Sequence, residues 1–294
     1  MRSISRIVRA TTFALALALV AFGVALAQEG VHWSYEGESG PEHWGDLSPE
    51  FAACSKGVEQ SPIDIPAGAP VNVADIAFSY QPNELKIFNN GHTVQVAYDP
   101  GSSITLDGTT YNLAQFHFHA ASEHAIGGAH TPLEIHLVHR NAQGGLAVVG
   151  VLLKAGAENA AYAPVMQNLP TQVTKEAAPV AGVTVDANQL LPAQRSYWRY
   201  NGSLTTPPCS EGVKWLVMHD PVELSEAQIA AFTSIHQNDA RPVQQFNART
   251  FLVPVRLPTT GGATLRLDGA LVGVGLLAIA AGLALAYIGR HRLV

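Results

Sequence analysis

The sequence predicts a single, mostly β domain of the α+β class with few helices. Two observations carry this prediction. Apolar residues between about residues 28 and 265 either alternate with polar ones or form short continuous runs, the patterns of half-buried and fully buried strands. Helical periodicity is limited to two short segments. A stretch of about 240 residues is long enough to bury most of its apolar surface as one domain.

The predicted strands follow one another along the middle of the chain, separated by turn residues and long connections. They are residues 92–98, 103–119 with an Asp-Gly turn inside it, 133–140, 146–154 and 213–224. The clearest helix is predicted for residues 225–236, where Ser225 is a suitable N-cap and the apolar residues Ile229, Phe232 and Ile235 share one face. A second short helix is predicted for residues 158–169, before Pro170.

Both ends of the chain have the character of targeting or membrane segments. Residues 1–27 combine three arginines, an apolar stretch and a closing Ala25-Leu26-Ala27, the pattern of a cleaved secretory signal; a retained membrane anchor is the alternative. Residues 269–289 contain no charged residue and are long enough to cross a bilayer as a helix. A buried core helix is the alternative there.

The orientation of this span follows from the basic tail behind it. Arg290, His291 and Arg292 place residues 290–294 in the cytoplasm by the positive-inside rule, and a Pro/Thr/Gly-rich linker at 256–268 joins the span to the domain. We therefore expect an exported, membrane-anchored protein whose domain, residues 28–255, lies at the cell surface or on the periplasmic side. Small residues four apart in the span are compatible with pairing but too unspecific to predict an oligomer.

The charge of the chain limits its partners. All 23 acidic residues lie between the two end segments, whereas five of the 17 basic residues lie within them. The part between the ends therefore has a formal charge of −11. Such an acidic surface argues against nucleic acid or anionic lipid as a partner.

The two cysteines, Cys54 and Cys209, are most simply interpreted as one disulfide in an exported chain. The bridge would close a loop of about 155 residues, which chain-entropy models value at a few kcal/mol. Zinc ligation and free thiols are the alternatives, and an oxidising compartment makes both less favourable.

Two histidines in the segment AQFHFHA are the first functional candidates. His117 and His119 project from one face of a predicted strand, while Phe116 and Phe118 point the other way. The next strand carries His136, which comes opposite the pair if the register allows. Three imidazoles converging on one point, with a fourth position open, are the arrangement of a catalytic zinc site.

Two further residues are suited to support these ligands. Glu134 lies two residues from His136 on the same face and can hold the second nitrogen of a ligating imidazole; Gln115 can do the same for a neighbouring ligand. From spacing alone a chance grouping stays open, because the chain contains 12 histidines.

At this point the sequence resembles the α-class carbonic anhydrases. The resemblance rests on QFHFH, SEH and LEIHLVH around the histidines, and on HWSYEGESGPEHWGDL (32–47), QSPIDI (60–65), NNGHTVQV (89–96), GLAVVGVLLK (145–154), YWRYNGSLTTPPCSEGVKWLV (197–217) and ARPVQ (240–244) in the family's order. That many motifs in order are highly specific. The resemblance implies a central, twisted, mainly antiparallel sheet of about ten strands with short peripheral helices.

The resemblance also implies the chemistry. His117, His119 and His136 would hold Zn²⁺, and zinc-bound hydroxide would hydrate carbon dioxide reversibly to bicarbonate and a proton. Thr205 in SLTTPP matches the residue that accepts a hydrogen bond from this hydroxide, and Glu123 in SEH matches the carboxylate that takes the threonine's proton. Taken alone, these two residues would be assigned as a turn residue and a solvated loop charge.

Further matches concern substrate and proton. His92 in NNGH matches the proton shuttle, although a histidine after Asn-Asn-Gly is by itself more typical of a turn. The resemblance also assigns three polar residues that would order water: Tyr35, Asn90 and Gln95. It assigns an apolar wall for carbon dioxide, formed by Val138, Val148, Leu204 and Trp215, and places Thr206 on the bicarbonate side. It further implies a bridge from Cys54 to Cys209 that would fix the Thr205 loop. Ordinary core packing is the alternative for the wall.

The chain departs from the family pattern at Ala120, where many members have tryptophan, and the loop 120–132 is short and rich in Gly and Ala. Two other functions remain compatible with the resemblance: a carbonic-anhydrase-like binding or adhesion domain with little turnover, and a zinc esterase. The presence of all three histidines weighs against the first. The expected partners are therefore carbon dioxide and bicarbonate, with the membrane contacted through residues 269–289.

Overall fold

The computed structural model describes residues 31–72 and 76–253. The predicted signal (1–27), linker (256–268), membrane span (269–289) and tail (290–294) lie outside these residues, so those predictions stay predictions. Within the described residues, no helix combines the length and the apolar character needed to cross a membrane.

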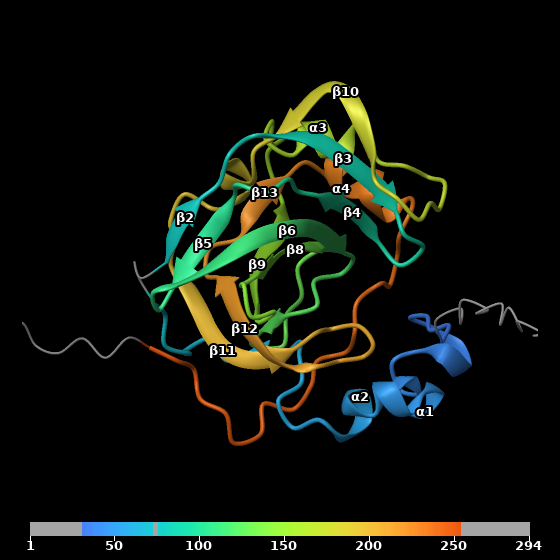
Figure 1. Cartoon of the computed structure of the whole chain (residues 1–294), viewed down its shortest axis with the longest axis vertical. Helices are drawn as coiled ribbons and strands as arrows, with labels where there is room; N and C mark the ends of the chain where they lie inside the picture. The colour runs from blue at the N-terminus through green and yellow to red at the C-terminus, as the bar shows by residue number, and fades with distance from the viewer. Residues whose placement is uncertain (1–30, 73–75, 254–294) are drawn as a thin grey trace, which may run out of the picture. The chain divides into compact units, whose positions relative to one another are not determined.

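An 11-stranded mixed sheet dominates the described part of the chain (Figure 1). Eight strands form the path β10-β3-β4-β6-β8-β9-β12-β11, while β5 pairs with β6 and β2, and β13 pairs with β9. The strands are β2 (Ala77–Ser79), β3 (Asn83–Asn89), β4 (Val94–Ala97), β5 (Ser103–Leu106), β6 (Thr109–His119), β8 (Leu133–Arg140), β9 (Leu146–Ala155), β10 (Ala178–Val185), β11 (Tyr197–Ser203), β12 (Glu211–Met218) and β13 (Val222–Leu224).

The remaining elements are short. A separate parallel pair joins β1 (Asp64–Ile65) to β7 (Ala125–Ile126). The helices are α1 (Trp44–Leu47), α2 (Ala53–Lys56), α3 (Ala163–Met166) and α4 (Glu226–Thr233), with 3₁₀ turns at Gly37–Ser39, Pro49–Phe51 and Ala187–Leu190. A mostly β domain with few short helices is therefore confirmed for the described residues.

Antiparallel pairing prevails in the large sheet, but β9 runs parallel to both β12 and β13. The predicted strand 213–224 is in fact two strands, because Pro221 has no N–H with which to continue a ladder. The segment 103–119 forms the predicted hairpin, with Asp107 and Gly108 both at positive φ in the turn. The large sheet of the described residues thus has 11 strands, close to the expected number of about ten, and it is mixed.

Both predicted helices are shorter than their predicted ranges. In α4 Ser225 forms a capping box with Gln228, as its sequence suggests, but the regular helix ends at Thr233 because the Ile235 amide bonds three residues back to Phe232. Helix α3 covers only four residues of 158–169, beginning next to Pro164, which is tolerated only in a first turn.

Alternation along the central strands separates two apolar clusters. One contains Phe116 and Phe118 of β6, and Phe118 packs on Phe232 of α4 with ring centroids 5.5 Å apart. The other contains Val148 and Trp215. Because β6 and β8 turn alternate residues to each face, His117, His119 and His136 project away from the first cluster, whereas His139 of β8 lies on the cluster's side and bonds to Tyr80.

Candidate metal centre

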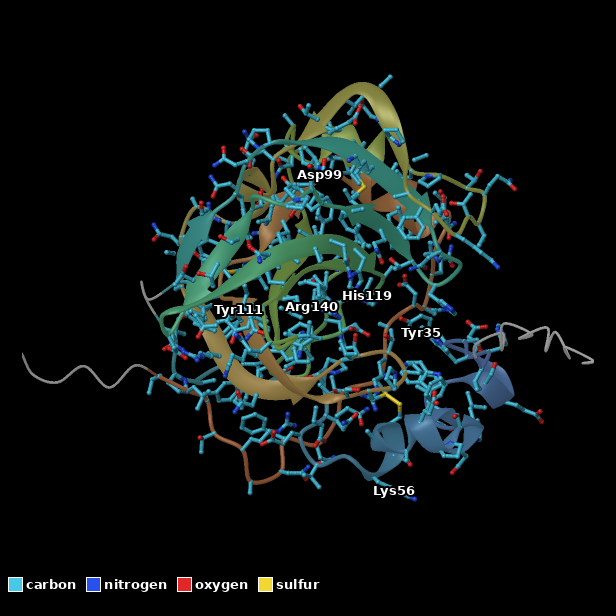
Figure 2. The ribbon with its side chains drawn as sticks, viewed as in Figure 1. Tyr35, Lys56, Asp99, Tyr111, His119 and Arg140 are labelled. Carbon is cyan, nitrogen blue, oxygen red and sulfur yellow. A yellow bond between two sulfur atoms is a disulfide. The ribbon has the colours of Figure 1, made fainter. Side chains whose placement is uncertain are left out.

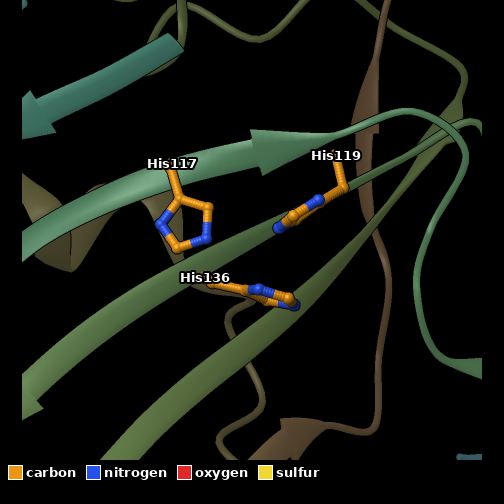
Figure 3. Close-up of side chains that lie close together, drawn as sticks. All are labelled: His117, His119 and His136. Carbon is orange, nitrogen blue, oxygen red and sulfur yellow. The ribbon is translucent and has the colours of Figure 1, made fainter. Parts of the chain in front are cut away.

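Three histidines of adjacent strands converge, as Figure 3 shows. His117 and His119 lie on β6, and His136 lies directly opposite His117 in the β6–β8 register. One ring nitrogen from each lies within 4.8 Å of the others. His119 and His136 are each 1 % exposed. The structure therefore brings the three predicted ligands to one point.

Hydrogen bonds fix which nitrogen of each ring faces that point. His117 donates from Nδ1 to Gln115 Oε1 at 2.9 Å, and His136 donates from Nε2 to Glu134 Oε1 at 2.9 Å. His119 donates from Nδ1 to the backbone carbonyl of Asp239 at 2.7 Å. Because a neutral imidazole carries one N–H, the other nitrogen of each ring keeps its lone pair. These lone pairs belong to Nε2 of His117, Nε2 of His119 and Nδ1 of His136.

The donor set fits a metal ion. His119 Nε2 is buried and has no hydrogen-bond partner, which is costly unless something accepts its lone pair. Burial lowers the pKa of His117 well below its usual value and that of His136 to about 4. Burial thus keeps these two rings in the neutral form that ligates metals, and three such nitrogens with an open position suit a catalytic divalent ion.

Glu134 connects the metal ligands to a buried chain of hydrogen bonds. Its carboxylate accepts from His136 and also from His124, at 2.7 Å from the ring Nδ1 and 2.8 Å from the backbone amide. Tyr200 then donates to His124 Nε2 at 2.7 Å and accepts from Ser61 at 2.9 Å. Burial alone would raise the pKa of Glu134, but its interactions with His124 and His136 lower it well below the usual value.

A glycine makes room for this carboxylate. Gly150 of β9 lies opposite His136, and a Cβ there would come 2.9 Å from Glu134 Oε1. The sequence predicted Glu134 as a supporting residue but not His124, Tyr200 or Gly150. These three lie within the motifs SEH, YWRY and GLAVVGVLLK, to which other residues gave their predicted roles.

Glu123 and Thr205 lie next to the histidines. Glu123 is fully buried, and its Oε1 accepts from the Arg241 amide at 2.8 Å. Its Oε2 has no hydrogen-bond partner and lies 3.6 Å from His119 Nε2 and 3.8 Å from His136 Nδ1. Burial raises the pKa of Glu123 to about 8, against the opposing effects of the Arg241 amide and the Thr205 hydroxyl. Glu123 therefore lies beside the candidate metal ligands, with the Thr205 hydroxyl near enough to lower its pKa.

A disulfide and two hydrogen bonds at Cys209 fix the loop that carries Thr205. Cys209 forms a disulfide with Cys54 of α2, which confirms the predicted bridge. The Cys209 amide donates to the Thr206 carbonyl at 2.8 Å, and Gln60 donates to the Cys209 carbonyl at 3.1 Å. Thr205 itself is 6 % exposed. The loop therefore presents Thr205 from a fixed backbone.

The four predicted wall residues form part of one apolar cluster. Val138 of β8 pairs with Val148 of β9, which pairs with Trp215 of β12. Leu204 joins from the loop before Thr205. Since Val138 shares a face with His136, this cluster lies on the metal side of the sheet.

A cavity of about 140 Å³ opens next to the histidines. Its walls include His117 and His119 together with the polar residues predicted for water and proton transfer: Tyr35, Asn90, His92 and Gln95. Thr206, predicted for the bicarbonate side, lines it as well. Figure 2 labels Tyr35 and His119, which come from the N-terminal segment and from the end of β6. Asn90 also holds the turn, since its Oδ1 accepts from the amides of His92 and Thr93 at 2.9 Å.

His92 stacks on Trp33, a contact that the sequence did not suggest. The ring centroids are 3.8 Å apart and the planes differ by 7°. Partial burial lowers the pKa of His92, and nearby His32 adds to the effect. His92 therefore stands at the cavity wall, away from the three converging nitrogens.

Fold and site together define a class: a mostly β protein in which three converging histidines form a candidate metal site next to a polar cavity and an apolar wall. The model of the eukaryotic-type carbonic anhydrase family matches residues 39–253. A carbonic anhydrase from Klebsiella pneumoniae is 45 % identical over 75 % of this chain and 90 % of its own length. A carbonic anhydrase from Pectobacterium carotovorum is 43 % identical over 81 % of this chain and 97 % of its own length.

A solved structure is equally similar. The α-carbonic anhydrase of Thermovibrio ammonificans, in complex with the inhibitor sulfanilamide, has a TM-score of 0.72 and 43 % identity over 76 % of this chain and all of that one. The chain therefore belongs to the eukaryotic-type, or α-class, carbonic anhydrase family.

Proposed function

We propose that this domain catalyses the reversible hydration of carbon dioxide to bicarbonate and a proton, with zinc held by His117, His119 and His136. The observation that carries the proposal is the convergence of three neutral imidazole lone pairs, one of them on a buried nitrogen without a partner. When bound there, zinc would act as a Lewis acid that makes water a nucleophile near neutral pH, an effect of which carbonic anhydrase is the standard example.

Glu123 and Thr205 would orient the attacking oxygen. The positive charge of a bound zinc would lower the pKa of Glu123 from its value of about 8 and so favour its ionised form. The Thr205 hydroxyl has one proton, which an ionised Glu123 would accept as a hydrogen bond. The Thr205 oxygen can then only accept, so it accepts from the nucleophile and leaves a lone pair directed at the substrate. The Arg241 amide donates to Glu123 Oε1 and so fixes the orientation of the carboxylate that would accept from Thr205.

The apolar cluster would receive the substrate. Carbon dioxide has no hydrogen-bond donor and little polarity, so a surface of Val138, Val148, Leu204 and Trp215 can accommodate it without binding water tightly. Thr206 lines the polar side of the cavity, where bicarbonate would leave.

The proton would leave through His92. This imidazole lines the cavity with His117 and His119, and its pKa near or below the usual value lets it both take and release a proton near neutral pH. Tyr35, Asn90 and Gln95 share the cavity and would order the connecting water.

We further propose that the domain works outside the cytoplasm, held by residues 269–289. The support is the sequence of the two ends together with the disulfide, because disulfides persist in oxidising compartments.

Stopped-flow measurement of carbon dioxide hydration by the full chain in detergent tests the main proposal. We expect a rate that disappears on zinc removal, returns with one zinc per chain and is blocked by sulfanilamide. A metal-loaded protein without hydration activity would instead favour the binding-domain alternative.

A further inference from the structure

A second, larger cavity lies outside the site described above. Its volume is about 510 Å³, within the usual range for small-molecule sites. It lies between the N-terminal segment, including Tyr35, Glu36 and Glu42, and the two loops that contain Ser122 and Arg241. Tyr35 is shared with the cavity at the histidines, whereas His117 and His119 line only the smaller one.

This second cavity is lined by residues of the same loops that position the candidate metal site. Ser122 precedes Glu123 in the chain. Asn238 and Ala240 flank Asp239, whose carbonyl accepts from His119. Arg241, also in the wall, donates its amide to Glu123. An occupant would therefore press on the backbone that positions a metal ligand and the Glu123–Thr205 pair.

Small side chains open the cavity on the side of the metal loops. Ala121 and Ala240 line it, and Ala121 follows Ala120, the position at which this chain departs from the family's tryptophan. Pro41 and Pro242 add apolar surface. The body of an occupant would therefore be small and largely apolar.

The charges presented to an occupant are negative. Glu36 and Glu42 are exposed carboxylates of the wall. Arg241 is 2 % exposed, and its terminal nitrogens donate to Gln60, to the Ser61 carbonyl and to the Cys54 carbonyl. The guanidinium keeps its charge but is directed at these interior acceptors, and the two exposed glutamates outnumber it in the wall.

His130 adds an acceptor. Its Nδ1 donates to the Ser122 carbonyl at 2.7 Å, so Nε2 keeps a lone pair on an exposed ring of the cavity wall. Two carboxylates and an imidazole nitrogen are all acceptors, and they match a ligand that carries N–H donors and a positive charge.

We propose that this cavity binds an organic cation, an amidinium or ammonium group on a small apolar body, at the same time as the metal site binds its own ligand. The occupant changes the rate of carbon dioxide hydration through the loops of Ser122 and Arg241; this second part rests on the proposed function. Amidinium N–H groups bond to Glu36, Glu42 and His130, while the apolar body lies against Ala121 and Ala240.

Benzamidine is a suitable probe, because its charge does not change near neutral pH and it therefore cannot act as a proton carrier. Its binding to the full chain would be measured by calorimetry, with and without saturating sulfanilamide. We expect saturable binding in both cases, with a Kd that sulfanilamide changes by no more than the modest factor that couples the two sites. Absence of saturable binding, or competition with sulfanilamide, would overturn the proposal.

Paired substitutions locate the site. The double variant Glu36→Gln/Glu42→Gln should weaken benzamidine about fivefold or more, the loss expected from two partly exposed ion pairs. Glu38→Gln is the matched control, since Glu38 lies in the same exposed turn outside the cavity wall. Equal affinity of the double variant and the control would place the probe elsewhere and overturn the proposal.

Activity tests the regulatory part separately. In saturating buffer, benzamidine should change kcat/KM of the wild type and the control by the same factor, and that of the double variant much less. Binding without any effect on rate would overturn the regulatory part alone. An inactive protein that still binds benzamidine would count against the proposed function and not against the cavity.

Discussion

The backbone carbonyl of Asp239 accepts a 2.7 Å hydrogen bond from Nδ1 of His119, a residue 120 positions earlier in the chain. The same residue uses its carboxylate to accept from the Ala120 amide at 2.6 Å. Asp239 therefore holds both the ring of a proposed zinc ligand and the end of the strand that carries it. Its other carboxylate oxygen, Oδ2, is buried without a partner.

Asp239→Ala should weaken zinc binding by about tenfold or more, because outer-shell contacts of metal ligands typically contribute that much to affinity. The substitution removes the acceptor of the Ala120 amide and lets the end of β6 move. Asp239→Asn is the control, since its amide oxygen can still accept. Competition for zinc with a chelator measures both, and equal affinities of the Ala and wild-type proteins would contradict this role.

His119→Ala should abolish stoichiometric zinc binding and hydration activity together. Two imidazoles cannot complete a site that needs three ligands from the protein. Metal analysis after gel filtration gives the first readout and stopped-flow hydration the second. His219→Ala serves as the control because that exposed histidine belongs neither to the converging group nor to the walls of either cavity. Full zinc content in the His119 variant would refute its role as a ligand.

His92→Ala should slow turnover in dilute buffer and leave it nearly normal in concentrated buffer, with recovery on addition of imidazole. A shuttle must be deprotonated before it accepts a proton. Burial lowers the pKa of His92 below its usual 6.5, so the wild-type rate in dilute buffer should rise with pH through a midpoint below 6.5. A midpoint that is unchanged in the His92 variant would show that protons leave by another path.

The parts of the site that could be predicted are those that depend on alternation. Because side chains alternate along strands, His117 and His119 had to share a face, and the register then placed His136 opposite His117. Family motifs added Glu123, Thr205 and His92, which alternation alone could not find. The disulfide followed from two cysteines in a chain for which a secretory signal is predicted.

The parts that could not be predicted depend on long-range contacts with no pattern of their own. Asp239 accepts from His119 through its backbone carbonyl, and every residue has such a carbonyl. This contact therefore leaves no trace in the sequence. The parallel pairing of β9 with β12 joins strands separated by more than 50 residues and is set by topology. The stacking of His92 on Trp33 likewise depends on how the N-terminal segment folds back.

Glu123→Gln should lower kcat/KM by about 100-fold while zinc stays bound. A glutamine amide can donate to the Thr205 oxygen, after which that hydroxyl is free to donate its proton to the nucleophile and no longer orients it. Thr205→Val removes the same hydroxyl and should give a loss of similar size. Because both residues act as one unit, the double variant should be little worse than either single one. Fully additive losses would contradict the coupling.

Replacement of both cysteines by serine should destabilise the domain by about 2–5 kcal/mol, the usual loss for a native disulfide. The bridge closes a sequence separation of 155 residues and fixes the Thr205 loop to α2. Activity should therefore fall before the domain unfolds, because Thr205 loses its support first. Denaturant unfolding gives the stability, and hydration measured at denaturant concentrations below the unfolding transition gives the local effect. A variant that keeps full activity up to its unfolding midpoint would show that the Gln60 bond to the Cys209 carbonyl suffices to hold the loop.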